Sequence, residues 1–459
     1  SFLREKYHNN IKELNHEWWT AFWSHTFDDF DQIDPPGPLG ENCVHGLNID
    51  WMRFTTETPC YFLDSEAAVL RQYAPNIPVT TNLMGTYRYL NYFEMAKHRI
   101  KYMKSFFIGN IEIKVPVIQG GMGVGISLSG LASAVANEGG VGVISCAGLG
   151  LLYPKEKGTY TEKCISGLKE EIRKSRMKTK GIIGVNVMVA LSNYADMVRT
   201  AINEKIDVIF SGAGLPLDLP SYLTTGSITK LVPIVSSSRA AKIICDKWQK
   251  NYNYLPDAIV VEGPKAGGHL GFKKEQLQDQ NYALDVLIPE VVAIAASYKE
   301  QKHIPVIAAG GISTGEDIAH FMELGASGVQ MGSIFVTTLE CDASETFKEV
   351  YIHSKSEDVL IIESPVGMPG RAIDGEFIHS VNNGLEKPRK CSFHCVKTCD
   401  YTKSPYCIIK ALYNAAKGNM KKGYAFAGSN AFLADKISSV KEVMNTLERE
   451  FFLATHKLV

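Results

Sequence analysis

The chain has 459 residues, of which 45% are hydrophobic and 21% are charged, and its formal net charge is −1. This length allows one large barrel plus a further module, and the composition is ordinary for a globular protein. The charge balance excludes a strongly basic surface, and no apolar run approaches the ~20 residues that span a bilayer. We therefore expect no nucleic-acid partner and no membrane partner.

The first 97 residues differ from the rest of the chain. Four of the five tryptophans precede residue 52, whereas glycine-rich segments with short Val/Ile runs begin only after about residue 105. We place a domain boundary near residues 96–106. The chain starts with Ser and lacks a signal-peptide pattern, so we expect the natural N-terminus to be missing.

Three sequence stretches in this first domain are distinctive: Ala21-Phe-Trp-Ser-His-Thr-Phe, Gly46-Leu-Asn-Ile-Asp-Trp-Met-Arg-Phe and Pro78-Val-Thr-Thr-Asn-Leu-Met-Gly-Thr-Tyr. They resemble an internal stretch of the family 42 β-galactosidases. The resemblance implies a piece of a catalytic barrel, which should leave open strand edges. Glycoside cleavage needs two carboxylates, and the family's two carboxylate motifs are not found, so we expect a non-catalytic fragment in which Glu41 and Asp50 are solvated or structural. An appended carbohydrate-recognising module is the alternative.

Eight short apolar runs separated by helical spacers follow. The strands are predicted at Val115–Gln119, Val141–Ser145, Ile182–Asn186, Val208–Ser211, Pro233–Ser236, Ala258–Glu262, Pro305–Ala309 and Gly328–Met331. The clearest intervening helices are predicted at Ser129–Asn137, Tyr194–Asn203 and Thr314–Leu324. This alternation is typical of parallel βαβ units, and eight units favour a closed (β/α)₈ TIM barrel over residues 106–345.

The remaining segments are assigned to the surroundings of the barrel. Residues 264–304 are predicted to form an excursion over the active site. The C-terminal extension, residues 346–459, is predicted to be partly helical, at Ile408–Lys417 and Val440–Phe451, and to pack outside the barrel.

Active sites in such barrels lie at the C-terminal ends of the strands. After the first strand, Gly120 and Gly121 let the backbone approach a flat ring, and Met122 offers a soft apolar contact. Asn186 can donate and accept hydrogen bonds toward a heterocycle, although a local cap is the plainer interpretation. His269 lies in a glycine-flanked loop and would suit a general base near neutral pH.

Two glycine turns follow the last two predicted strands, Gly310-Gly311 and Gly332-Ser333. Glycines leave backbone N–H groups accessible, and a following helix start adds positive partial charge. Two such turns on neighbouring strands form a socket for one phosphate, as after strands 7 and 8 of many barrels. The sequence therefore predicts a phosphate-bearing ligand.

The stretches Val117-Ile-Gln-Gly-Gly-Met-Gly, Gly184-Val-Asn-Val-Met, Glu262-Gly-Pro-Lys-Ala-Gly-Gly-His and Ala308-Ala-Gly-Gly-Ile occur in this order. In this they resemble the nitronate monooxygenase (2-nitropropane dioxygenase) family of flavin barrels. The resemblance implies FMN, with Gln119, Gly120, Gly121 and Met122 at the isoalloxazine, Asn186 at its polar edge, Gly268, Gly310, Gly311, Gly332 and Ser333 at the ribityl phosphate, and His269 as the catalytic residue. It also implies oxidation of small alkyl nitronates by O₂, and it leaves a homodimer open.

The resemblance does not fix the substrate. FMN-dependent enoyl-acyl-carrier-protein reductases, which use NAD(P)H in fatty-acid or polyketide synthesis, share the phosphate turns and the Gly-Gly-His motif. The long C-terminal extension fits this second group as well as the first. Both chemistries therefore stay open at the level of the sequence.

Four of the ten cysteines, Cys391, Cys395, Cys399 and Cys407, lie within 17 residues. Such clustered thiols could hold an iron–sulfur cluster or Zn²⁺, with His394 as a further ligand, or serve as structural or redox thiols. In a helix, positions 391, 395 and 399 would share one face. The other six cysteines are scattered along the chain, which favours a reducing cytoplasm over a disulfide scaffold.

Overall fold

A computed structural model describes residues 2–23, 26–36, 44–73, 91, 103–388 and 390–455. The chain divides into two compact units, Ser1–Lys101 and Tyr102–Val459. Within the described ranges, no helix combines the length and the apolar character that crossing a bilayer requires. The predicted boundary near residues 96–106 falls largely on residues outside the described part of the chain.

The described part of the first unit is helical. It contains α1 (Phe2–Lys6), α2 (Ile11–Glu17), two short 3₁₀ turns (Thr20–Trp23 and Phe30–Gln32) and α3 (His45–Tyr73). The expectation of open strand edges is therefore wrong for these residues. A small apolar cluster that includes Leu14, Trp18 and Phe30 gives the helices something to pack against. The stretch from Pro78 and the candidate Glu41 lie outside the described residues.

Asp50 is structural, as expected. Its carboxylate is 2% exposed and accepts hydrogen bonds from Tyr7 Oη at 2.6 Å, Arg53 Nη1 at 2.9 Å and Trp18 Nε1 at 3.1 Å, and Lys6 also contacts it. Burial raises the pKa of Asp50, but the hydrogen bonds and cationic neighbours outweigh it, so the pKa lies below its ordinary value. A carboxylate so fully engaged has no lone pair left for glycoside chemistry.

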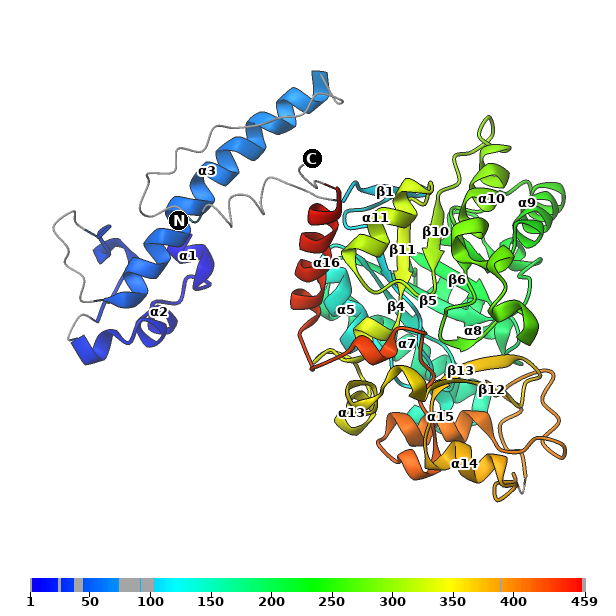
Figure 1. Cartoon of the computed structure of the whole chain (residues 1–459). Helices are drawn as coiled ribbons and strands as arrows, with labels where there is room; N and C mark the ends of the chain where they lie inside the picture. Colours follow the sequence, from blue (N-terminus) through cyan, green and yellow to red (C-terminus); the bar gives the residue numbers. More distant parts are fainter. Residues whose placement is uncertain are drawn as a thin grey trace. The chain divides into compact units, whose positions relative to one another are not determined.

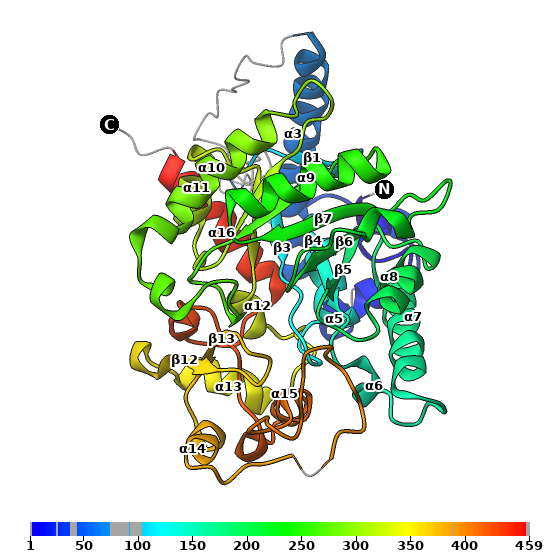
Figure 2. The same cartoon turned by 90° about the vertical axis from the view of Figure 1, so that its right-hand side faces the viewer.

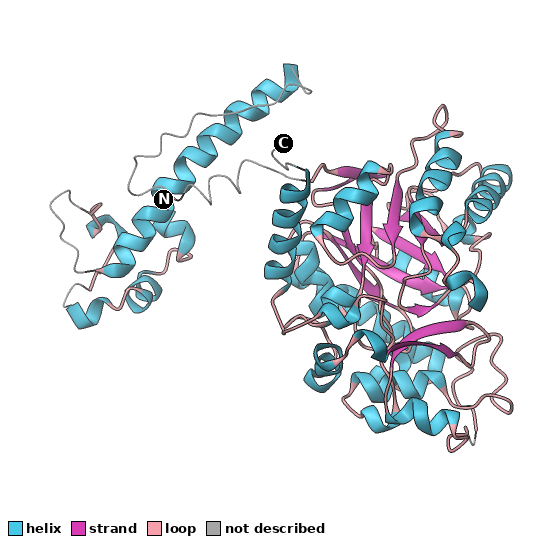
Figure 3. Ribbon diagram, in the orientation of Figure 1, coloured by secondary structure: helices cyan, strands magenta, loops and turns pink. Residues whose placement is uncertain are grey.

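The second unit is built on the predicted closed parallel barrel (Figures 1 and 3). Its strands are β3 (Val117–Gln119), β4 (Val141–Ser145), β5 (Ile182–Met188), β6 (Val208–Gly212), β7 (Lys230–Val235), β8 (Ile259–Glu262), β10 (Val306–Ala309) and β11 (Gly328–Met331). The barrel closes where β11 pairs with β3, with Val329 opposite Val117. All eight predicted strands are confirmed, with shifts of up to three residues at their ends.

The interior of the barrel is apolar at the N-terminal end of the strands. An antiparallel hairpin, β1 (Phe106–Ile108) and β2 (Ile111–Ile113), packs its buried side chains against interior residues such as Ile118 and Phe210. Gly328 makes room for it, because a Cβ there would lie 2.8 Å from the Phe106 ring. The hairpin thus fills the end of the barrel opposite the strand ends that carry the site.

Helices surround the strands (Figure 2). They are α5 (Ser129–Asn137), α6 (Leu149–Leu152), α7 (Tyr160–Lys178), α8 (Tyr194–Asn203), α9 (Ser238–Tyr252), α10 (Leu284–Ala296), α11 (Gly315–Glu323), α12 (Ser333–Val336), α13 (Glu345–His353), α14 (Glu376–Asn382), α15 (Ile408–Ala416) and α16 (Val440–Thr455). The last helix, α16, packs beside α11 and α5. The apolar faces of the helices around the barrel and the outer faces of the strands form the main hydrophobic core.

The rest of the C-terminal extension lies over the mouth of the barrel, which corrects the expectation that it packs outside. Strand β12 (Val359–Glu363) pairs with β13 (Pro369–Ile373), and β13 pairs in turn with β9 (Gly268–His269), a short strand of the predicted excursion after β8. This antiparallel pairing gives hydrogen-bond partners to the backbone groups along one edge of β9. The extension therefore forms a roof over the strand ends.

Candidate functional site

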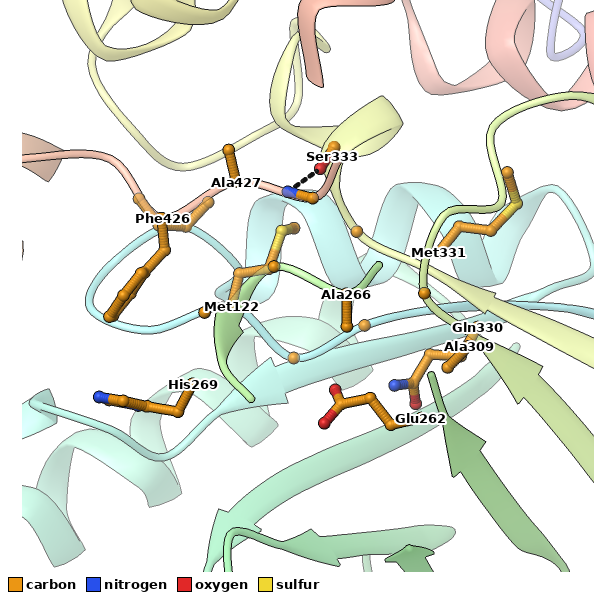
Figure 4. A pocket seen from close by; sticks show the side chains of 18 of the residues that line it. Met122, Glu262, Ala266, His269, Ala309, Gln330, Met331, Ser333, Phe426 and Ala427 are labelled. Atoms are coloured by element: carbon orange, nitrogen blue, oxygen red, sulfur yellow. Dashed lines mark hydrogen bonds between the residues drawn. The ribbon is translucent and has the colours of Figure 1, made fainter. Parts of the chain in front are cut away.

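A cavity of about 1550 Å³ opens at the C-terminal ends of the barrel strands (Figure 4). Ten of the eleven residues predicted for the site line it: Gly120, Gly121, Met122, Asn186, Gly268, His269, Gly310, Gly311, Gly332 and Ser333. The cavity is larger than the ~300–1,000 Å³ of a typical small-molecule site. It has room for a cofactor together with a substrate.

Gln119 does not line this cavity. Its side chain is fully buried in the barrel, where it donates to the carbonyl oxygen of Gly120 and accepts from the amide of Val143 at 3.0 Å. Gln119 therefore braces β3 against β4, and its side chain does not line the cavity in which the contact with the isoalloxazine is predicted. Its strand-end position gave no sign that its side chain faces inward.

Three polar side chains at strand ends enter the cavity without protein partners. Asn186 lies in the C-terminal half of β5, Glu262 ends β8, and Gln330 lies next to the last residue of β11. No described residue hydrogen-bonds any of these three side chains, so the local-cap interpretation of Asn186 is wrong. Burial raises the pKa of Glu262 to about 7. These three side chains are partly buried and line the cavity without protein partners, so they are available to a ligand with a polar edge.

His269 is fixed by the roof. Backbone pairing places it opposite Gly370 of β13, and Nε2 lies 2.7 Å from Ser364 Oγ in the turn between β12 and β13. The imidazole also meets the Phe426 ring edge-on, with 5.0 Å between the centroids (Figure 4). Burial lowers the pKa of His269 to about 4, so the ring is neutral at neutral pH.

The glycine turn after β10 has the backbone that a phosphate cradle requires. Gly310 and Gly311 have φ values of 100° and 79°. A Cβ at Gly310 would lie 2.9 Å from the amide nitrogen of Ala266, and one at Gly311 would lie 2.8 Å from the Cβ of Lys265. Within the described residues, the amides of these two glycines and of Ser333 have no acceptor. They are therefore available to an anion.

The start of α11 does not contribute as expected. Ser313 and Thr314 donate their amides to Asp317 at 2.8 and 3.0 Å, and Gly315 donates to Glu450 of α16 at 2.9 Å. Protein carboxylates thus occupy the first amides of this helix. The anion-binding capacity of the turn after β10 therefore rests on the amides that precede Ser313.

Arg371 of β13 stabilises the loop that leads to His269. Its guanidinium is 9% exposed and donates to the carbonyl oxygens of Pro264 at 2.8 Å and Ala266 at 2.6 Å. No carboxylate of the described residues forms an ion pair with it, and burial lowers its pKa. In a planar peptide the N–H points opposite to the C=O. Arg371 therefore turns the amide of Gly267, a cavity residue, away from itself.

The sequence model of the nitronate monooxygenase family matches residues 104–450, which is most of the chain. The chain belongs to the nitronate monooxygenase family. One relative, a probable nitronate monooxygenase of Staphylococcus saprophyticus, is 27% identical over 298 residues, covering 60% of this chain and 79% of that protein. The solved structure of FabK from Thermotoga maritima is similar with a TM-score of 0.58 and 27% identity, over 75% of this chain and 95% of that one.

Residues 1–108 match the model of a different family, a β-galactosidase family. The β-galactosidase GanA of Bacillus subtilis is 48% identical over 103 residues, which are 21% of this chain and 15% of that enzyme. The chain thus spans about 15% of the length of this relative. The resemblance of the first unit to a β-galactosidase fragment is confirmed.

Membership of the nitronate monooxygenase family implies a flavin. The cavity fits this cofactor in two respects. Glycine amides without acceptors lie at one end, after β10, and polar side chains without partners lie at the ends of β5, β8 and β11. The individual residue roles remain predictions.

The cysteine cluster gives no support to a metal site. Among the described residues, no three His, Cys, Asp or Glu side chains are arranged to hold a metal ion. Residues 391–399 are not helical, so the shared helix face does not exist. Cys395 is instead buried in an apolar cluster with Val124 and Ile409, and burial raises its thiol pKa to about 12. Such a thiol is a poor ligand.

Several residues of the site were missed from the sequence, namely Ser364, Arg371 and Phe426, and also Asn430, which lines the cavity. The Gly- and Pro-rich segment 364–370 between two apolar runs is a readable hairpin signal. Nothing in the sequence indicates that this hairpin pairs with β9, because the pairing joins segments about 100 residues apart.

Proposed function

We propose that this enzyme oxidises alkyl nitronates with O₂, with FMN bound along the ends of the barrel strands. The observation that carries the proposal is the neutral His269 in the wall of the same cavity as the glycine turns. FMN, when bound, supplies the electron chemistry. The chain supplies the orientation of substrate and the handling of its charge and proton.

His269 can serve two forms of the substrate. One ring nitrogen is held by Ser364, and the other is left for substrate. With a nitronate anion, a ring N–H donates a hydrogen bond to a nitro oxygen. With a neutral nitroalkane, the unprotonated nitrogen accepts the α-proton as the C–H bond breaks. Proton abstraction requires the neutral imidazole that burial favours, and the neutral ring can also donate an N–H to the nitronate.

An enoyl thioester reductase using NAD(P)H is the second candidate, and one observation favours it. The roof adds an apolar region to the cavity, lined by Val396, Ile409 and Leu412 together with Leu191 and Val124 of the barrel. Val396 pairs with Leu191, which joins this wall to the barrel. A small nitronate does not need such a surface, whereas an acyl chain would bury apolar area against it.

Anaerobic addition of propyl nitronate to FMN-loaded enzyme, and separately of NADH, tests the proposal by the absorbance of the flavin. We expect bleaching by the nitronate, because the bound cofactor takes up its electrons. Bleaching by NADH with no response to nitronate would replace the proposal by the reductase. Enzyme without bound flavin would remove both.

A further inference from the structure

A short segment of the C-terminal extension, Ala427–Asn430, lies across the glycine turns, and we call it the strap. Gly428 donates its amide to Ser333 Oγ at 2.9 Å (Figure 4). Ser429 donates its amide to the carbonyl oxygen of Lys265 at 3.1 Å. The first of these bonds reaches the turn after β11, and the second reaches the loop after β8. The strap thus ties together two of the cavity's turns.

The strap approaches the barrel backbone closely. A Cβ at Gly267 would lie 2.6 Å from the carbonyl carbon of Ala427 and 2.6 Å from the amide nitrogen of Gly428. Two backbones are therefore in contact with no side chain between them. This explains why the loop carries a glycine at 267, beside Gly268, whose own Cβ direction is open.

Asn430 connects the strap to the third turn. Its Nδ2 donates to the carbonyl oxygen of Gly311 at 2.9 Å and to Ser313 Oγ at 2.9 Å. Its Oδ1 accepts from Ser429 at 3.0 Å. By holding the Gly311 carbonyl, Asn430 turns the amide of Ile312 the opposite way in the planar peptide. Ile312 lines the cavity, and within the described residues its amide has no acceptor.

We propose that the strap completes the phosphate socket of the cofactor, and that Asn430 is a positioning residue that selects a phosphorylated flavin over an unphosphorylated one. Asn430 acts through the Gly311 turn, without contact to the reacting ring. The proposal rests on the binding of FMN and is independent of whether nitronates or enoyl thioesters are turned over.

The test is a titration of apoprotein with FMN and, in parallel, with riboflavin, which lacks only the phosphate, followed by quenching of flavin fluorescence. Asn430→Ala removes two hydrogen bonds to the turn, so we expect the Kd for FMN to rise on the order of tenfold. The Kd for riboflavin should stay within about twofold, since the ring end is untouched. Asn430→Asp keeps the size but loses the donor and adds a negative charge, so its effect on FMN should be at least as large.

Asn414→Ala is the matched control. Asn414 also donates its side-chain amide to a backbone carbonyl, that of Lys422 at 3.1 Å, but it does not line the cavity. The Asn414→Ala variant should bind FMN with the same Kd as the parent. Circular dichroism confirms folding of each variant, and Asn430→Asp carries the test if Asn430→Ala fails to fold.

Two results would overturn the proposal. The first is an FMN Kd within about twofold of the parent in folded Asn430 variants. The second is an equal loss of affinity for FMN and for riboflavin, which would give Asn430 a general structural role. If the parent enzyme binds FMN but does not react with nitronates, the proposed function is contradicted and the proposal about the strap still stands. If the parent binds no FMN, both proposals are contradicted.

Discussion

The barrel and the C-terminal extension contribute different kinds of group to the same cavity. The barrel supplies backbone amides at Gly310 and Gly311 and polar side chains at strand ends, such as Glu262. The extension supplies groups that act on the barrel's own residues, Ser364 on His269 and Asn430 on Gly311. The comparison teaches that the chemistry belongs to the barrel, while its alignment depends on a segment that follows the barrel in the sequence.

The largest expected effect tests the barrel side of this comparison. His269→Ala should retain FMN but lose about 10²–10⁴-fold in turnover of neutral nitroalkanes, because the proton acceptor is gone. Steady-state rates with nitroethane, together with the flavin content of the purified variant, measure this. His320→Ala is the control, because His320 is half-exposed and pairs with Asp285 on the surface. Unchanged rates in His269→Ala would remove the role assigned to this residue.

The second prediction concerns the opposing pKa shifts of two cavity residues in the apoprotein. His269 has a folded pKa of about 4, below its ordinary 6.5, so its contribution to the free energy of unfolding is lost as the pH falls from 6.5 to 4. Glu262 has a folded pKa of about 7, above its ordinary 4.5, so its contribution is lost as the pH rises from 4.5 to 7. Each effect amounts to at most about 3.5 kcal/mol.

These two slopes cancel in the parent between pH 4.5 and 6.5, and single variants should separate them. Relative to the parent, Glu262→Gln should lose stability on acidification below pH 6.5, and His269→Ala should lose stability as the pH rises from 4.5 toward 7. Urea unfolding of the apoproteins at several pH values measures both. Parallel profiles in all three proteins would show that the cavity does not shift these groups.

The smallest expected effect tests the extension side. Ser364→Ala removes the hydrogen bond to His269 Nε2, so kcat/KM should fall about tenfold with the FMN Kd unchanged. Ser364→Thr, which keeps the hydroxyl, should restore most of the loss and the parent pH profile of kcat. A Thr variant as slow as the Ala variant would point to packing in the β12–β13 turn instead of the hydrogen bond.

The barrel could be predicted from the sequence because its signals are local. Each strand is a short apolar run, and each strand end is marked by a glycine or a polar residue within a few positions, as at Ala309-Gly310 and Met331-Gly332. Periodicity and glycine placement are enough to order such units. From the same signals we predicted ten residues that line one cavity in the structure.

The roof could not be predicted, because its contacts are long-range. Asn430 and Gly311 are 119 residues apart, and Ser364 and His269 are 95 residues apart. Segment 424–430 mixes aromatic and small residues and gives no local sign of these distant partners. The cysteines misled for a related reason: their spacing suggested a ligand set, whereas burial of Cys395 against Val124 shows that apolar packing decides their environment.

Arg371 links the stability of the fold to the binding of the cofactor. Its charge is buried, and its described partners are neutral carbonyls of the loop between β8 and β9. A buried cation without a counter-ion is unfavourable. A phosphate held by the amides on the opposite side of that loop would place negative charge near it. The fold is therefore expected to melt at a higher temperature when loaded, by an amount that includes this electrostatic compensation as well as the direct contacts of the ligand.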